Sequence, residues 1–64
     1  MNDKMLHHLS QKIDEKVGRL QEAIGTGVAK DYAEYQKMCG EVQGLLTARL
    51  YISDLDKNLE NSNE

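Results

Sequence analysis

Proline, tryptophan and phenylalanine are absent from this sequence, and Cys39 is the single cysteine among its 64 residues. One cysteine cannot form an internal disulfide, which excludes the disulfide-stapled class of small extracellular domains and favours a reducing compartment. A chain of this length buries only about 60% of the surface that its unfolded form exposes, so its core is small. The sequence therefore predicts one domain over residues 1–64 without room for an enzyme pocket, and we expect neither catalytic activity nor a cofactor.

Long apolar runs are also missing. The longest are Gly44–Leu46 and Leu50–Ile52, far shorter than the roughly 20 residues that a membrane-spanning helix needs. Polar residues between His7 and Lys12 interrupt the N-terminal segment, so it lacks the apolar core of a secretory signal. We therefore expect a soluble, cytoplasmic protein without a membrane partner.

Positive charge is in short supply, because 8 Lys and Arg residues face 11 Asp and Glu residues, for a net charge of −3. A protein that binds nucleic acid usually needs clustered Lys and Arg to displace counterions from phosphates, so we expect no nucleic-acid partner. The charges cancel within residues 1–53, and the excess lies in the last eleven residues. There Lys57 is accompanied by four acidic residues: Asp54, Asp56, Glu60 and Glu64.

Apolar residues recur at intervals of three and four from the start of the chain, which predicts an amphipathic helix over about residues 3–24. Gly25 and Gly27 follow it, and glycine supplies the left-handed conformation with which helices often end. The apolar face of this helix is the first half of the predicted core: Leu6, Leu9, Ile13, Val17, Leu20 and Ile24.

A second helix is predicted to start after Asp31, since Asp31 and Glu34 have the spacing of a capping box. The helical pattern then continues without proline over about residues 32–60, and the polar residues 61–64 are expected to fray. The core residues of this helix are Met38, Val42, Leu45 and Ile52.

A connection of only a few residues favours antiparallel packing, so we predict an all-α, coiled-coil-like two-helix hairpin. Apolar residues recur every seven residues on both predicted helices, as a slight left-handed crossing requires. Pairing outward from the turn places Leu6 near Leu50, and everything after Ser53 is expected to extend beyond the first helix.

Arg49 interrupts the apolar row of the second predicted helix. Its long side chain is expected either to reach solvent or to pair with a carboxylate. Glu41, Asp56 and a carboxylate of a partner protein are the candidates.

Apolar residues on the second predicted helix span about twice the roughly 100° band that one partner helix covers. Surplus apolar surface indicates association, so we expect self-association, for example as a four-helix dimer, or docking onto a larger protein. Small residues at 40, 44 and 48 let another backbone approach, either inside the hairpin or from a partner. The predicted partner interface comprises Gly40, Gly44, Leu46, Leu50, Tyr51, Leu55 and Leu59.

No pattern indicates a catalytic or metal site. His7 and His8 are adjacent and diverge by about 100° on a helix, so they cannot both face one metal ion. His7 is instead placed to pair with Asp3, and His8 to lie against the end of the second helix. Cys39 lacks a recognisable histidine and carboxylate and is interpreted as a small buried hydrophobe. The three tyrosines lack the basic groove that base stacking needs, so we expect them to pack with solvated hydroxyls.

The segment Lys30-Asp31-Tyr32-Ala33-Glu34-Tyr35 is followed by Gly40-Glu41-Val42-Gln43-Gly44-Leu45, and then by Ala48 and Ile52-Ser53-Asp54-Leu55. This succession of a tyrosine-rich helix start, two glycines four residues apart and a closing segment resembles small helical-hairpin proteins of tailed bacteriophages. The resemblance implies a non-enzymatic, virion-associated accessory protein that decorates or bridges capsid, portal or neck subunits. It carries over no catalytic residue.

The leading hypothesis is therefore a structural protein that docks through its apolar helical faces. The alternative is a free intracellular regulator or inhibitor whose acidic end contacts a basic surface of a host or viral enzyme. The sequence leaves the identity of the partner and the oligomeric state open.

Overall fold

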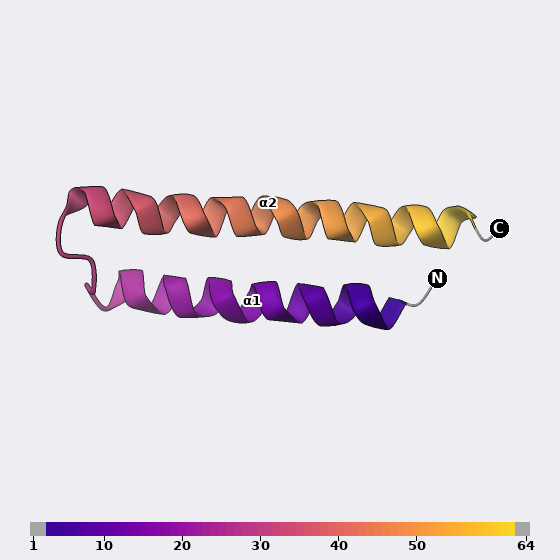
Figure 1. The fold of residues 1–64 in the computed structure, drawn as a ribbon, viewed down its shortest axis with the longest axis horizontal. Coiled ribbons are helices and arrows are strands. Elements are labelled where there is room, and N and C mark those ends of the chain that lie inside the picture. Colours follow the sequence, from indigo (N-terminus) through magenta and orange to yellow (C-terminus); the bar gives the residue numbers. More distant parts are fainter. Residues whose placement is uncertain (1–2, 63–64) are drawn as a thin grey trace.

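The computed structural model of the chain is a pair of antiparallel helices, α1 (Asp3–Gly25) and α2 (Tyr32–Ser62), joined by one loop (Figure 1). The structure describes residues 3–62, with side chains from residue 4 to residue 59. The molecule is a rod with extents of 51 × 16 × 12 Å, and residues 3–62 contain no strand. The predicted all-α hairpin is confirmed, and each helix end lies within two residues of its predicted position.

The turn after α1 forms where the glycines predicted it. Gly27 has φ of 77°, in the left-handed region that favours glycine. The backbone N–H of Val28 donates to the carbonyl of Ala23 at 3.1 Å, and that of Gly27 donates to Ile24 at 3.2 Å. This pair of bonds is the Schellman arrangement, which satisfies carbonyls that a helix end would otherwise leave unpaired.

The start of α2 has the predicted cap. The Asp31 carboxylate accepts a hydrogen bond from the backbone N–H of Glu34 at 2.8 Å, as an N-cap residue does. Glu34 in turn accepts from the backbone N–H of Lys30 at 3.3 Å, one residue before the usual capping-box donor. At the other end α2 continues to Ser62, two residues past the predicted bound, and residues 63–64 of the expected frayed tail lie outside the described residues.

The core between the helices is thin. Among the side chains described, only Val17 and Val42 are buried apolar groups, 7% and 9% exposed. Leu9 was predicted for the core, but it is 47% exposed, and half-buried Ser10 lies in its place. The reason is the heptad row, in which the inward positions 6, 10, 13 and 17 alternate spacings of four and three. The remaining predicted core residues are half-buried: Leu6, Ile13, Leu20, Ile24, Met38, Leu45 and Ile52.

The pairing of the helices is shifted from the predicted register. Leu6 and His7 line the same groove as Ser53 and Asp56, and Asp56 is half-buried. The prediction that everything after Ser53 overhangs is therefore wrong. The loop runs outward past the end of α1 before α2 begins, so the start of α2 lies beyond that end and later residues of α2 lie beside α1 (Figure 1). A shorter C-terminal part of α2 still extends past the start of α1.

Candidate interaction surface

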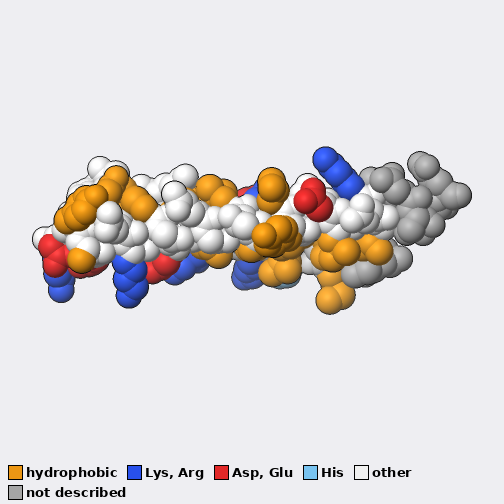
Figure 2. All heavy atoms as spheres, turned by 90° about the horizontal axis from the view of Figure 1, so that it is seen from above, with side chains coloured by type: hydrophobic (Ala, Val, Ile, Leu, Met, Phe, Trp, Pro, Cys, Tyr) orange, Lys and Arg blue, Asp and Glu red, His pale blue; other side chains and the backbone are white. Residues whose placement is uncertain are grey.

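Large apolar side chains remain exposed along α2. Leu50 and Tyr51 are 63% and 68% exposed, which places both largely in solvent. Figure 2, which looks down on α2, shows hydrophobic side chains in several separate groups along this face. The surplus apolar surface that the sequence predicted is therefore present. Its largest members on the two helices are Met5, Leu9, Tyr32, Tyr35, Leu46, Leu50, Tyr51 and Leu55.

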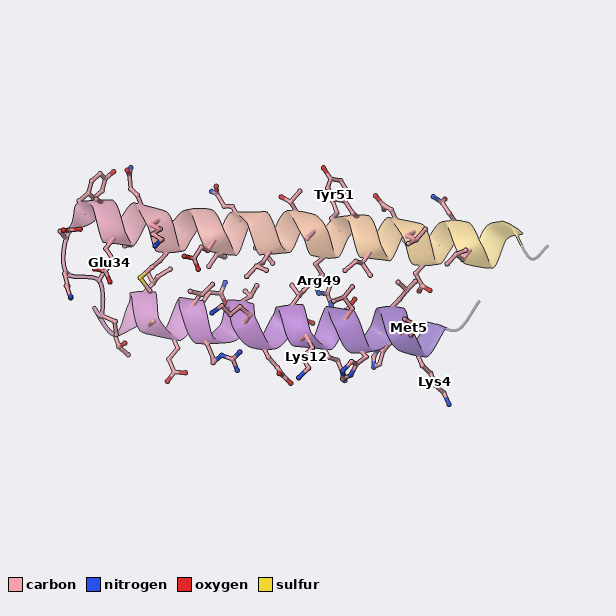
Figure 3. All side chains as sticks on the ribbon, viewed as in Figure 1. Lys4, Met5, Lys12, Glu34, Arg49 and Tyr51 are labelled. Atoms are coloured by element: carbon pink, nitrogen blue, oxygen red, sulfur yellow. The ribbon has the colours of Figure 1, made fainter. Side chains whose placement is uncertain are left out.

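The residues of the predicted partner interface do not share one face of α2. Leu46 and Leu50 are four residues apart and form one flank of the helix, which we call the leucine flank. Tyr51 lies on the side away from α1, and Figure 3 shows its side chain pointing outward. Leu59 is half-buried at the end of the row that faces α1. A partner that contacted all of them would have to enclose the helix.

The side of α2 that faces away from α1 carries two glycines, a threonine and a tyrosine. We define this outer face as Gly40, Gly44, Thr47 and Tyr51, and the exposed charged residues Lys37 and Asp54 continue it toward the two ends of the helix. A Cβ atom added at either glycine would meet nothing within 4 Å. The alternative that these glycines allow a close approach inside the hairpin is therefore wrong, and the partner alternative stays a prediction.

Arg49 joins the two helices. Its Nε and Nη2 atoms donate to the two carboxylate oxygens of Asp14 at 2.6 and 3.1 Å, and Figure 3 shows its side chain directed toward α1. This bond, reinforced by the negative charge of Asp14, raises the pKa of Arg49, and partial burial opposes the rise. The side chains are 45% and 51% exposed, so solvent screens the pair.

The predicted partners of Arg49, Glu41 and Asp56, were wrong. Side chains on a helix lean toward its N-terminus, so in an antiparallel pair those of Arg49 and Asp14 lean toward each other. The position of Arg49 in the inward row indicated that it would face α1. Asp14 was missed because choosing it required the observed register.

An open groove of about 720 Å³ lies between the first half of α1 and the second half of α2. One carboxylate oxygen of Asp56 is shielded there without a hydrogen-bond partner. His7 and His8 both line the groove, and both are exposed. Within residues 3–62 no group of three His, Cys, Asp or Glu side chains is placed to hold a metal ion. The side chain of Asp3, the predicted partner of His7, lies outside the described residues.

The tyrosines near the turn form a local cluster. The rings of Tyr32 and Tyr35 stack with centroids 6.2 Å apart, and Gln36 donates to the Tyr32 hydroxyl at 2.9 Å. The pKa of Tyr35 is raised, mainly by a hydrogen bond with Cys39. The negative charge of the ionised Cys39 and partial burial raise it further. Cys39 is half-buried rather than fully buried as predicted. These contacts all lie within the first turns of α2 and use no residue of α1.

Neither α1 nor α2 has a stretch long and apolar enough to cross a lipid bilayer within residues 3–62. The resemblance to phage hairpin proteins stays a prediction. Comparisons of the chain with models of protein families, with curated proteins and with solved structures found no match.

Proposed function

We propose that this protein is a non-enzymatic accessory protein that docks through α2 onto larger subunits, with a phage capsid, portal or neck as the assembly. The observation that carries the proposal is the imbalance between core and surface. Two apolar side chains are buried between the helices, whereas four large ones between residues 46 and 55 of α2 are nearly half exposed or more. Exposed apolar surface of this extent is typical of a protein that a partner covers.

The energies involved favour a partner that covers the leucine flank. Burying one leucine side chain contributes about 1.5–3 kcal/mol relative to leaving it exposed. A chain below about 70 residues rarely gains more than about 3–5 kcal/mol from its own core. Leu46 and Leu50 are 45% and 63% exposed, so covering both buries about the surface of one leucine and adds about 1.5–3 kcal/mol, a large fraction of what the core of the hairpin supplies.

The regulator alternative depends on the acidic end of α2, and the structure favours it less. Asp54 is exposed, but Asp56 is half-buried with one oxygen shielded from solvent. The side chain of Glu60 lies outside the described residues. An acidic mimic needs several carboxylates in solvent, so we retain the docking proposal.

The direct test is mass spectrometry of particles purified from the native source. We expect the chain in those particles, and we expect the double substitution Leu46→Asp and Leu50→Asp to remove it. Both leucines are exposed, at 45% and 63%, so circular dichroism should find the helix content of the variant retained.

Asn58→Asp is the control, because it adds a charge to an exposed position of α2 that lies outside the leucine flank. It should leave the amount of chain in the particles unchanged. Absence of the expressed wild-type chain from particles would refute the virion assignment. If neutralising Asp54 and Asp56 abolished partner binding while the leucine substitutions did not, the regulator alternative would replace it.

A further inference from the structure

We infer that one lateral side of the hairpin, formed by both helices, binds an acidic amphipathic helix of a partner protein. We call it the basic-apolar side. Its apolar half, near the chain ends, contains Met5, Leu9 and Leu55, and its basic half, toward the turn, contains Lys12, Lys16 and Arg19. The inference deepens the proposed function and rests on it, because it gives the chemistry of a second subunit surface besides the one that covers the leucine flank.

The two helices present this side together. In an antiparallel pair, residues one position before the inward rows lie on one side of the rod, and residues one position after them lie on the other. The open groove marks the second side, because His7, Gln11 and Ser53 each follow an inward residue. The six residues of the basic-apolar side each precede an inward residue, so they lie opposite the groove. Figure 2 shows this side along its lower edge, where Lys and Arg side chains project toward the turn end and hydrophobic ones follow toward the chain ends.

The apolar half is one surface shared by α1 and α2. Met5 is 71% exposed, and Leu9 and Leu55 are 47% and 46% exposed. The hydrogen bonds between Arg49 and Asp14 set the register. Leu9 lies five residues before Asp14 and Leu55 lies six residues after Arg49, so the antiparallel helices bring the two leucines to about the same height. An apolar surface across two helices suits a third helix that packs against both.

The basic half gives the charge of that third helix. Lys12, Lys16 and Arg19 are exposed, and none of them forms an ion pair with the side chains described for residues 4–59. They are four and three residues apart, so like charges are neighbours on the helix surface, which is destabilising. Glu41 lies on the same side but farther toward the turn than Arg19. Carboxylates of a partner would relieve the repulsion along this row.

The acidic residues around the basic half favour a narrow partner over an anionic membrane. Glu15 and Glu22 are exposed on the far side of α1 from this row, and the net charge of the chain is −3. A membrane would meet the field of the whole chain, which repels an anionic surface. A helix about 10 Å wide meets only the row itself, and Met5 to Arg19 spans about 21 Å. The partner is therefore a helix with apolar residues at one end of its contact surface and Asp or Glu at the other.

Fluorescence anisotropy with two synthetic peptides tests the charge of the partner. Each is an amphipathic helix of about 18 residues with leucines on one face, and its polar positions are glutamate in the acidic peptide and lysine in the basic one. The contact is small, so we expect the full-length chain to bind the acidic peptide with a micromolar dissociation constant. The basic peptide should bind at least about tenfold more weakly, and added salt should reduce the difference. Equal binding of the two peptides would overturn the inference.

A charge reversal locates the contact. Lys16→Glu should weaken binding of the acidic peptide about fivefold or more and strengthen binding of the basic one. Lys57→Glu is the matched control, because it makes the same change at an exposed position of α2 that follows an inward residue and so lies on the groove side. It should leave both affinities unchanged. Equal losses in the two variants would mean that net charge alone governs binding, and the inference would fail.

A second pair of variants tests the apolar half. Met5→Gln with Leu55→Gln should weaken binding of the acidic peptide about fivefold or more, with helix content retained in circular dichroism because both side chains are exposed. Leu46→Gln with Leu50→Gln alters the leucine flank instead and should leave this binding unchanged. The opposite result would move the peptide to the leucine flank and contradict the inference.

Vesicles of phosphatidylcholine and phosphatidylglycerol are the competing probe. Binding of the chain to these vesicles but not to the acidic peptide would replace the helix with a lipid surface. All of these measurements use the chain alone, so their failure leaves docking of the leucine flank to be decided by the particle experiment. Absence of the chain from particles would in turn refute the virion assignment without changing the peptide result.

Discussion

The two helices of this hairpin differ in how their apolar residues are distributed. α1 is strongly amphipathic, with its apolar side chains concentrated on one face and charged residues opposite. α2 is only weakly amphipathic, because apolar residues lie on the inward row, the leucine flank and the outer face. Each helix contributes one buried valine, Val17 or Val42.

This difference indicates different neighbours. One neighbouring helix can bury the apolar residues of a helix that has a single apolar face. A helix with apolar residues on several sides needs neighbours on more than one side to bury them. α1 suits the outside of an assembly, facing solvent with its charged side. α2 exposes apolar residues on more than one side, and α1 covers only one of its sides.

The largest predicted effect is on the core that both helices share. Val42→Asp places a carboxylate in a site only 9% exposed and should reduce the free energy of unfolding by about 3 kcal/mol or more. That loss is comparable to the whole stability of a domain this small, so circular dichroism should show the helices largely melted.

Val28→Asp introduces the same charge in the loop, where Val28 is 59% exposed. It should change the free energy of unfolding by no more than about 0.5 kcal/mol. If Val42→Asp melted no more easily than this control, the inward row would not hold the helices together.

A smaller effect on stability is expected from replacing a glycine in either helix. Gly18 on α1 and Gly40 on α2 both lie in helix interiors where an added Cβ meets nothing within 4 Å. Replacing either by alanine should raise the free energy of unfolding of the single chain by up to about 1 kcal/mol. Thermal melts at low protein concentration should show this gain equally in both variants.

The smallest effect concerns the pair that joins the helices at their surface. Asp14→Arg and Arg49→Asp should each lower the melting temperature slightly, because each leaves two like charges side by side. The double exchange should restore it. The differences should shrink as salt is added, since the pair is half exposed and screened. A double exchange no more stable than the single variants would show that the ion pair does not contribute.

Local chemistry made several features predictable. The left-handed Gly27 and the Asp31 cap follow from residue types whose conformational preferences act within a few positions, so both were found where expected. The inward row was also predictable because it depends only on helical periodicity. Leu9 was the exception, since the 3–4 alternation continues through Ser10 instead.

The sequence by itself determined the two helices, their ends and the surplus of apolar residues on the second one, because these follow from interactions between near neighbours. Only the tertiary structure decided the register, and with it the pairing of Arg49 with Asp14 and the partial burial of Asp56. Register depends on the path of the loop between the helices. Heptad rows fit one another at several offsets one turn or more apart, so periodicity cannot choose among them. The same structure placed Gly40 and Gly44 opposite no part of α1, which left their neighbour to be sought outside the hairpin.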